Sequence, residues 1–173
     1  MFGSVGLWES DGVSTRLEAV LPDRLFGLLN GEHLSENLNK VILLVTLDDR
    51  GFPYAAMLSC LEVIARDHGN IRLAPWNNST TTANIRRNGK VALLVIDEGL
   101  AYYIQGTATE LAREMEGFSG MAKINVKIES VLEDKALDYE GSASITSGVR
   151  FENPQMDVAY IARGRRVLEA LRR

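Results

Sequence analysis

The chain has 173 residues, a length that fits one domain, and 46% of them are hydrophobic against 24% charged, which excludes a disordered chain. The net charge of −4 argues against a nucleic-acid-binding protein, because no stripe of basic residues dominates. A single cysteine, Cys60, excludes an internal disulfide, and its apolar neighbours predict a small buried residue and not a nucleophile.

The first residues have neither the basic start nor the long apolar core of a signal peptide. The longest apolar runs have the length of strands, well below the roughly 20 residues that a membrane-spanning helix needs. We therefore expect a cytoplasmic protein that makes no contact with a membrane.

The chain is predicted to begin with an irregular arm over residues 1–21, which is rich in glycine and serine at first. Pro22 and Asp23 are typical of a helix start, and Asn30-Gly31 is typical of a helix end. We predict a short helix between them, with Leu25, Leu28 and Leu29 on its buried side, and a further turn at Ser35-Glu36.

Six segments are apolar and rich in β-branched residues, and turn residues bound each of them. We predict a strand in every one: 41–47, 54–65, 71–74, 91–96, 100–111 and 123–131. The last of them alternates strictly, which indicates a half-buried strand. A single short helix follows the third strand, and this order favours a closed antiparallel barrel over residues 41–134 in a single domain.

The segment from Pro154 to Arg172 is predicted to form a C-terminal helix. Its expected apolar positions are Val158, Ile161, Ala162, Leu168 and Leu171. Gly164 interrupts the helix with a poor helix former. The basic residues 163–166 and 172–173 are interpreted as a solvated helix face and helix end, where cations are favourable.

Four consecutive hydroxyl residues, Ser79 to Thr82, stand where the short helix begins. Ser79 is sufficient to cap that helix, so three further threonines exceed what capping requires. Hydroxyl groups and free N–H groups at a helix N-terminus bind anions, and phosphate is the commonest biological one. The pattern predicts either a phosphate site or a capped turn with solvated polar residues.

Residues near these hydroxyls have two interpretations each. Trp76 is either a ligand contact or a core residue, Asn84 either a donor to the same anion or a surface amide, and Ser59 either a ligand contact or a partner of nearby backbone. Three cations follow the hydroxyls and either offset a phosphate or solvate the helix: Arg86, Arg87 and Lys90.

Other chemistries find little support in the sequence. The chain has no Walker loop, no G-x-G-x-x-G pattern and no G-x-S-x-G elbow. Its two histidines, His33 and His68, are far apart, and His33 with Glu36 is more typical of a surface contact than of a metal site. We therefore predict no metal and identify no catalytic residue.

Four segments that follow the predicted hairpin occur in an order that resembles the pyridoxamine 5′-phosphate oxidase-like family of FMN-binding split barrels: Gly69–Leu73, Asn78–Ile85, Asn88–Leu93 and Tyr103–Ala108. The resemblance spans about Val41 to Val131. It implies a mainly β fold, a six-stranded antiparallel split β-barrel of Greek-key type with short helices and a C-terminal helix. It also implies a homodimer with flavin mononucleotide (FMN) at the subunit interface.

The resemblance further implies which residues bind the cofactor. The flavin phosphate would contact Ser79, Thr80, Thr81 and Asn84, and the flavin ring would lie along Ala56–Ser59 and against Ala74–Trp76. The implied cofactor-binding set is Met57, Leu58, Ser59, Pro75, Trp76, Asn77, Asn78, Ser79, Thr80, Thr81 and Asn84.

Two departures from the authentic oxidase concern its phosphate and substrate residues. This chain has Ala56, Leu61 and Thr80-Thr81 where the oxidase has basic residues, so the phosphate would depend on neutral donors. No tryptophan follows Trp76, so the oxidase's C-terminal substrate segment has no counterpart. We expect an FMN-dependent oxidoreductase for another small molecule. The alternatives are a non-catalytic FMN carrier or sensor, and a barrel that binds haem or a deazaflavin.

Overall fold

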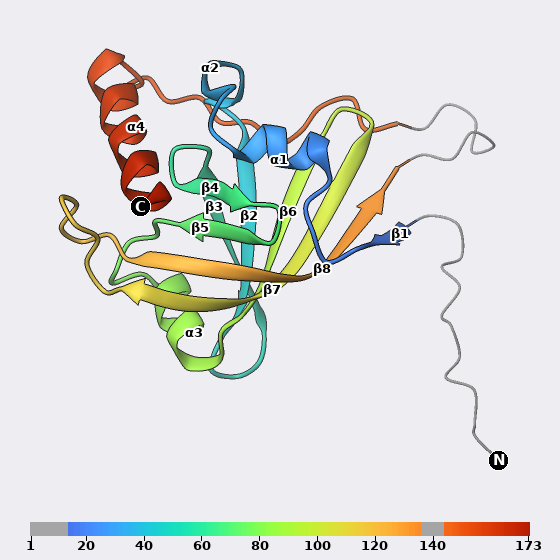
Figure 1. The fold of residues 1–173 in the computed structure, drawn as a ribbon, viewed down its shortest axis with the longest axis horizontal. Helices are drawn as coiled ribbons and strands as arrows, with labels where there is room; N and C mark the ends of the chain where they lie inside the picture. Colours follow the sequence, from blue (N-terminus) through green and yellow to red (C-terminus); the bar gives the residue numbers. More distant parts are fainter. Residues whose placement is uncertain (1–13, 136–143) are drawn as a thin grey trace.

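The computed structural model describes residues 14–135 and 144–173, and eight strands in them form one curled antiparallel sheet (Figure 1). The strands are β1 (Ser14–Leu17), β2 (Val41–Leu47), β3 (Pro53–Ser59), β4 (Val63–Asp67), β5 (Asn70–Leu73), β6 (Lys90–Asp97), β7 (Leu100–Ala112) and β8 (Lys123–Asp134). The helices are α1 (Asp23–Leu29), α2 (Leu34–Asn37), α3 (Thr80–Asn88) and α4 (Val158–Arg172).

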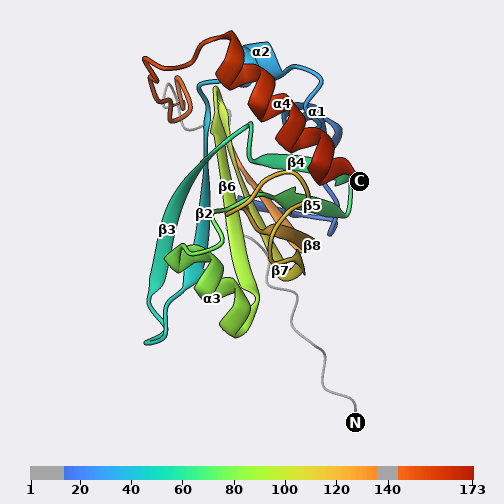
Figure 2. The ribbon, with the colours of Figure 1, turned by 90° about the vertical axis from the view of Figure 1, so that its left-hand side faces the viewer.

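The sheet order is β3-β2-β6-β7-β8-β5-β4, and β1 pairs with the far half of β8. The long strands β7 and β8 form the centre, and β3 ends the order on one side as an open edge (Figure 2). The sheet curls into a half-barrel with open edges, so the closed barrel that the strand order favours is wrong. The mainly β, antiparallel split barrel with short helices and a C-terminal helix is confirmed.

Two strands in the structure differ from the six that we predicted. The expected strand 54–65 is divided into β3 and β4 by a tight turn, in which the N–H of Glu62 donates to the carbonyl of Ser59 at 3.0 Å. The predicted arm contains β1, because residues 14–17 pair with residues 131–134 of β8. Residues 1–13 of that arm lie outside the described residues.

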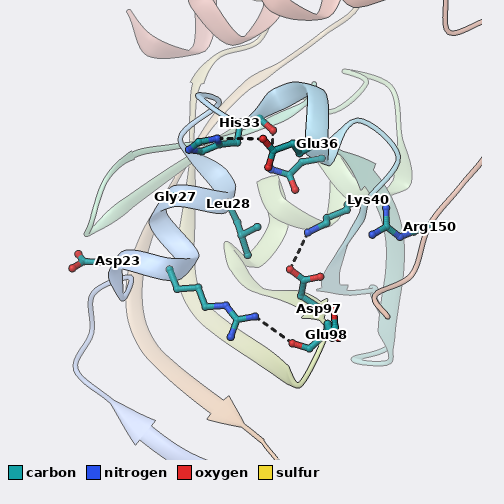
Figure 3. Close-up of a pocket in the computed structure, with 11 residues that line it drawn as sticks. Asp23, Gly27, Leu28, His33, Glu36, Lys40, Asp97, Glu98 and Arg150 are labelled. Atoms are coloured by element: carbon teal, nitrogen blue, oxygen red, sulfur yellow. Dashed lines mark hydrogen bonds and ion pairs between the residues drawn. The ribbon is translucent and has the colours of Figure 1, made fainter. Parts of the chain in front are cut away.

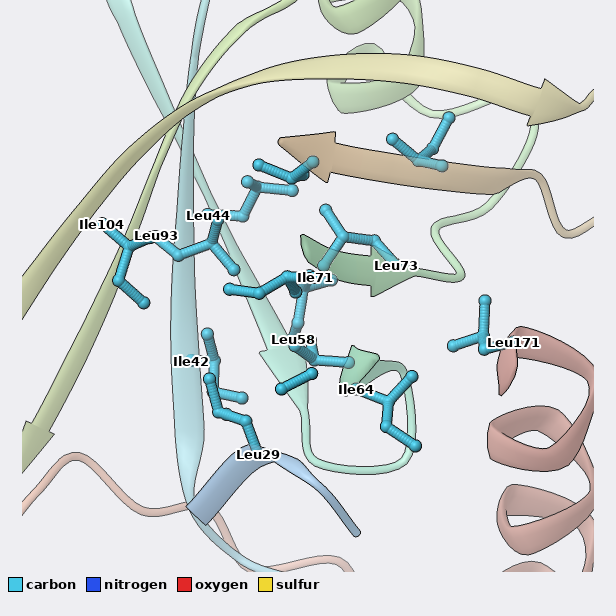
Figure 4. Packing of buried hydrophobic residues seen from close by; sticks show 14 of the residues in the cluster. Leu29, Ile42, Leu44, Leu58, Ile64, Ile71, Leu73, Leu93, Ile104 and Leu171 are labelled. Carbon is cyan, nitrogen blue, oxygen red and sulfur yellow. The ribbon is translucent and has the colours of Figure 1, made fainter. Parts of the chain in front are cut away.

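The hydrophobic core lies between the concave side of the sheet and helices α1 and α4 (Figure 4). Strand residues with no solvent exposure form its centre: Leu44, Ile64, Ile71, Leu73, Leu93, Ile104 and Ile124. Both of the predicted leucines Leu25 and Leu29 of α1 are buried with them, whereas Leu28 is only partly buried. Cys60 is buried, as predicted, and burial raises the pKa of its thiol to about 11.

Helix α4 begins at Val158, later than the predicted Pro154, because the Asp157 side chain caps it by accepting from the N–H of Tyr160. Val158 is 85% exposed, so it does not belong to the buried face, and Val167 takes that place beside Leu168 and Leu171. These residues follow the three- and four-residue spacing of one helix face.

Gly164 has a packing function that the sequence analysis did not predict. A Cβ atom at this position would lie 2.6 Å from Cδ2 of Leu61 in the turn between β3 and β4. Only glycine allows this close approach, so Gly164 sets how near α4 lies to the end of β3.

In the described part of the chain, no helix is long and apolar enough to cross a membrane.

Candidate functional site

Helix α3 begins with a serine cap. The Ser79 hydroxyl accepts from the N–H of Thr82 at 3.2 Å, and the Thr82 hydroxyl donates to the carbonyl of Trp76 at 2.8 Å. The N–H of Ser79 donates to that same carbonyl at 3.1 Å. Two of the four hydroxyls therefore fix the first turn of α3 to the loop before it.

The other two hydroxyls remain available. Thr80 is exposed and Thr81 is buried, and neither hydroxyl bonds to another described residue. The backbone N–H groups of Thr80 and Thr81 also lack a partner among the described residues, as expected in the first turn of a helix. Two N–H groups and two hydroxyl groups can thus meet an anion at this helix start.

Arg86 of α3 holds the loop in place. Its Nη1 donates to the carbonyl of Asn77 at 3.0 Å, and its Nε donates to Glu110 on β7 at 3.0 Å. The hydrogen bond from Arg86 lowers the pKa of Glu110 below its usual value. Because this carboxylate compensates the Arg86 charge, Arg86 orders the loop and neither solvates the helix nor offers a free cation.

Asn84 lies on the face of α3 that packs against β2. Its Nδ2 donates to the Thr46 hydroxyl at 3.0 Å, and its Oδ1 accepts from Arg87 at 2.8 Å. Asn84 is only 2% exposed. Both polar atoms are thus engaged, one with the sheet and one within the helix, so Asn84 anchors α3 to β2.

The loop before α3 is fixed to the segment that precedes β8. The carbonyl of the buried Pro75 accepts from the N–H of Ala122 at 2.9 Å, and the N–H of Asn77 donates to the carbonyl of Gly120 at 2.7 Å. Between these two bonds the Trp76 side chain projects outward and is 56% exposed. Asn78 is exposed next to it.

The end of β3 approaches this loop. Met57 is 72% exposed on the edge strand, whereas Leu58 is buried in the core on the opposite face. The Ser59 hydroxyl donates to Glu62 at 2.8 Å, and the N–H of Leu61 donates to the Ser59 hydroxyl at 3.3 Å. Ser59 thus stabilises the turn, which agrees with its interpretation as a partner of nearby backbone. It lies at the end of the edge strand β3.

A cavity of about 170 Å³ brings Ser59 and Trp76 together. Helix α4 forms its other wall with Tyr160, Arg163 and Gly164. The sequence analysis missed Tyr160 and Arg163, because nothing in the local pattern around residue 160 indicates a neighbour some 80 residues earlier. Of the predicted residues, Ser59 and Trp76 meet in this cavity, while residues 77–81 form the adjoining helix start.

A larger cavity, of about 560 Å³, lies elsewhere, between α1, α2 and the turn after β6 (Figure 3). Lys40 and Asp97 form an ion pair at 2.9 Å inside it. Burial raises the pKa of Asp97, but the hydrogen bond from Lys40 and nearby charges outweigh burial and lower it below the usual value. No predicted cofactor-binding residue borders this cavity.

The histidines lie apart from the candidate site. His68 donates from Nδ1 to the Leu21 carbonyl at 2.7 Å and stacks on Phe26, and His33 is 3.7 Å from Glu36 on α2, the surface contact that its spacing predicts. Among residues 14–135 and 144–173, no group of histidine, cysteine and carboxylate side chains is arranged to hold a metal ion.

Comparison with known proteins places these features in a family. The family model named pyridoxamine 5′-phosphate oxidase matches residues 32–145. The protein YclD of Bacillus subtilis (strain 168) is 36% identical over 153 residues, which covers 88% of this chain and 96% of YclD.

Solved structures agree at the level of the fold. A candidate pyridoxamine 5′-phosphate oxidase from Lactobacillus delbrueckii superposes with a TM-score of 0.53 at 20% identity, covering 67% of this chain and 97% of that one. HupZ of Group A Streptococcus superposes with a TM-score of 0.51 at 18% identity, covering 76% and 99%. The chain therefore belongs to the pyridoxamine 5′-phosphate oxidase-like family of split-barrel proteins.

Proposed function

We propose that this protein binds FMN along the end of β3, Trp76 and the start of α3 and uses it as an oxidoreductase on a small molecule. The observation that carries the proposal is the continuity of three features. The unpaired N–H groups of α3, the exposed Trp76 and the end of β3 follow one another, and Trp76 links the first to the last.

The start of α3 suits a phosphate group. Helix N-termini favour anions through their free N–H groups and the helix dipole. Thr80 and Thr81 add two hydroxyl donors, and Ser79 and Thr82 hold the turn in shape from the inside. We expect Thr80 and Thr81 to contact the phosphate and Asn84 to position the helix that presents them.

The exposed apolar side chains suit a flat ring. Trp76 and Met57 are large and apolar, yet both project from the surface near the end of β3. The cavity of about 170 Å³ is smaller than the roughly 300 Å³ at which small-molecule sites begin, so it can hold only part of a flavin. The remainder of the ring would lie on β3, and it needs a cover.

A second copy of the chain would supply that cover. The outer face of the sheet at its open edge carries Met57 on β3, Leu43 and Val45 on β2, and Leu94 on β6, and the strand register places them side by side. All are at least partly exposed, and apolar faces of this kind mark interaction sites. We propose a homodimer that buries this face and completes the flavin site.

Substrate would enter from the side of α4. Tyr160 and Arg163 border the same cavity as Ser59 and Trp76, and Arg163 forms no ion pair with another described residue. When bound, the flavin supplies hydride or electron transfer, and these two residues would orient the molecule that exchanges electrons with it.

The visible spectrum of the purified protein tests the proposal. Flavin absorption in the blue region, or quenching of added FMN fluorescence with saturation, is the expected result. A colourless protein whose melting temperature does not respond to FMN would refute flavin binding. A Soret band or saturable deazaflavin binding would favour the corresponding alternative cofactor, although neither histidine borders the cavity of Ser59 and Trp76.

Turnover separates an enzyme from a carrier. The FMN-loaded protein is mixed with NADH or NADPH and an artificial electron acceptor, and the loss of reduced nucleotide is followed. Sustained turnover above free FMN supports an oxidoreductase. Stoichiometric binding of FMN without turnover would instead support a carrier or sensor.

A further inference from the structure

A cavity of about 290 Å³ under the C-terminal end of α4 has no function in the proposal above. It shares no residue with the cavity that Ser59 and Trp76 border. Three cations from three parts of the chain border it: Arg72 on β5, Lys123 on β8 and Arg173 after α4. Glu116 is the one residue with a carboxylate side chain on its wall, against three cationic side chains.

Two of these cations hold the end of α4. Nη1 of Arg72 donates to the carbonyl of Leu171 at 2.6 Å, and Nζ of Lys123 donates to the carbonyl of Ala170 at 2.8 Å. Cations at a helix C-terminus are favourable, so these bonds have a structural explanation. That explanation uses one N–H group of each side chain and does not account for Arg173.

The side chain of Arg72 gives more specific evidence than the charge count. The side chain belongs to a residue that is only 7% exposed, and its buried Nε has no hydrogen-bond partner in the described chain. Burial and then the charge of Arg66 lower the pKa of Arg72, and burial and then Arg72 and Arg66 lower that of Lys123. An unpaired buried donor is costly, and so is the repulsion between neighbouring cations, which a bound anion would reduce.

Apolar side chains also border the cavity. Leu111 is half exposed, Ala112 is partly buried and Met115 is fully buried beside it. A ligand that fills the cavity would therefore place an anionic group at the cations and a hydrocarbon part against Leu111. Guanidinium groups recognise phosphate through paired N–H groups, and two of the three cationic side chains here are arginines.

We propose that this cavity is a second ligand site, which takes the phosphate monoester of a small apolar molecule. Titration calorimetry of the full chain, saturated with FMN, tests it with three probes: phenyl phosphate, inorganic phosphate and phenol. We expect saturable binding of phenyl phosphate, several-fold weaker binding of inorganic phosphate, and none of phenol. Saturation with FMN keeps the probes away from the flavin phosphate site.

Variants assign the binding to this cavity. Arg173→Gln is expected to weaken both phosphate probes about tenfold, whereas Arg173→Lys retains most of the affinity. Arg165→Gln removes the same charge from an exposed position of α4 and is the matched control. Leu111→Asn should abolish the preference for phenyl phosphate over inorganic phosphate without loss of phosphate binding.

Three results would overturn the proposal. The first is the absence of phenyl phosphate binding to wild type. The second is equal weakening by Arg173→Gln and Arg165→Gln, which would show only a diffuse charge effect. The third is a Lys123→Gln variant that melts at a lower temperature but binds as wild type does, because the cations would then only anchor α4. If the chain does not bind FMN, the same titration without FMN decides, since this site does not depend on the flavin.

Discussion

Replacement of Thr80 by valine tests the anion site without disturbing the fold. Thr80 is exposed in the first turn of α3, and its hydroxyl bonds to no described residue. Valine has nearly the same shape and a similar helix propensity. We expect the free energy of unfolding to change by less than about 0.5 kcal/mol, as for other surface substitutions.

FMN affinity should fall far more. A hydrogen bond to a charged group is worth about 1.5–3 kcal/mol, and each 1.4 kcal/mol is tenfold in the dissociation constant. Thr80→Val should therefore weaken FMN binding by about 10- to 150-fold, measured by the quenching of flavin fluorescence. Thr109→Val, at an exposed position of β7, is the matched control and should bind FMN as wild type does.

A substitution of Ser79 tests the helix cap separately from the anion site. Ser79→Ala removes the acceptor of the Thr82 N–H and should cost about 1 kcal/mol of stability, or roughly 2–4 °C in melting temperature. A protein that binds FMN equally well with threonine or valine at position 80 would show that the Thr80 hydroxyl does not contact the phosphate, and that assignment would be withdrawn.

Further variants test the packing and charges around the sites. Gly164→Ala should destabilise the protein by about 1–3 kcal/mol in denaturant unfolding, because its Cβ would overlap a leucine in the β3–β4 turn. Arg86→Gln should release the Glu110 contact, loosen the loop and raise the FMN dissociation constant, while the far-ultraviolet circular dichroism stays unchanged. The lowered pKa of Asp97 implies that its pairing with Lys40 stabilises the fold above the ordinary carboxyl pKa and is lost as the pH falls through the lowered value. Lys40→Gln should therefore be less stable than wild type at pH 7 but not at pH 2, by urea unfolding.

The sequence predicted the strands well where apolar residues and turn residues alternate in a clear order. Residues 41–47 and 100–111 show this, since both lie within a residue or two of β2 and β7. It failed at the division between β3 and β4, because Cys60 and Leu61 continue the apolar run through the turn. The polar Glu62, whose N–H and side chain close that turn, was the available signal.

Long-range partners explain the other differences. Strand β1 is polar and short, and only its pairing with residues 131–134 of β8 makes it a strand. The sequence predicted either a phosphate site or a capped turn at the four hydroxyl residues. In the structure, Ser79 and Thr82 bond within the turn, whereas Thr80 and Thr81 do not. Local sequence could not separate these roles, because they depend on where the Trp76 carbonyl lies.

Salt dependence distinguishes the two proposed phosphate sites. At the start of α3, Glu110 compensates Arg86, and Arg87 donates to the carbonyl of Leu47, so the phosphate of FMN would meet mainly neutral donors. At the end of α4, three cations face one carboxylate. Because salt screens interactions between charges far more than hydrogen bonds to neutral groups, we expect the FMN dissociation constant to rise less than about threefold between 50 and 500 mM NaCl, while that of phenyl phosphate rises much more. An FMN affinity that falls as steeply with salt as that of phenyl phosphate would mean that free cations, not the threonine hydroxyls and helix N–H groups, bind the flavin phosphate.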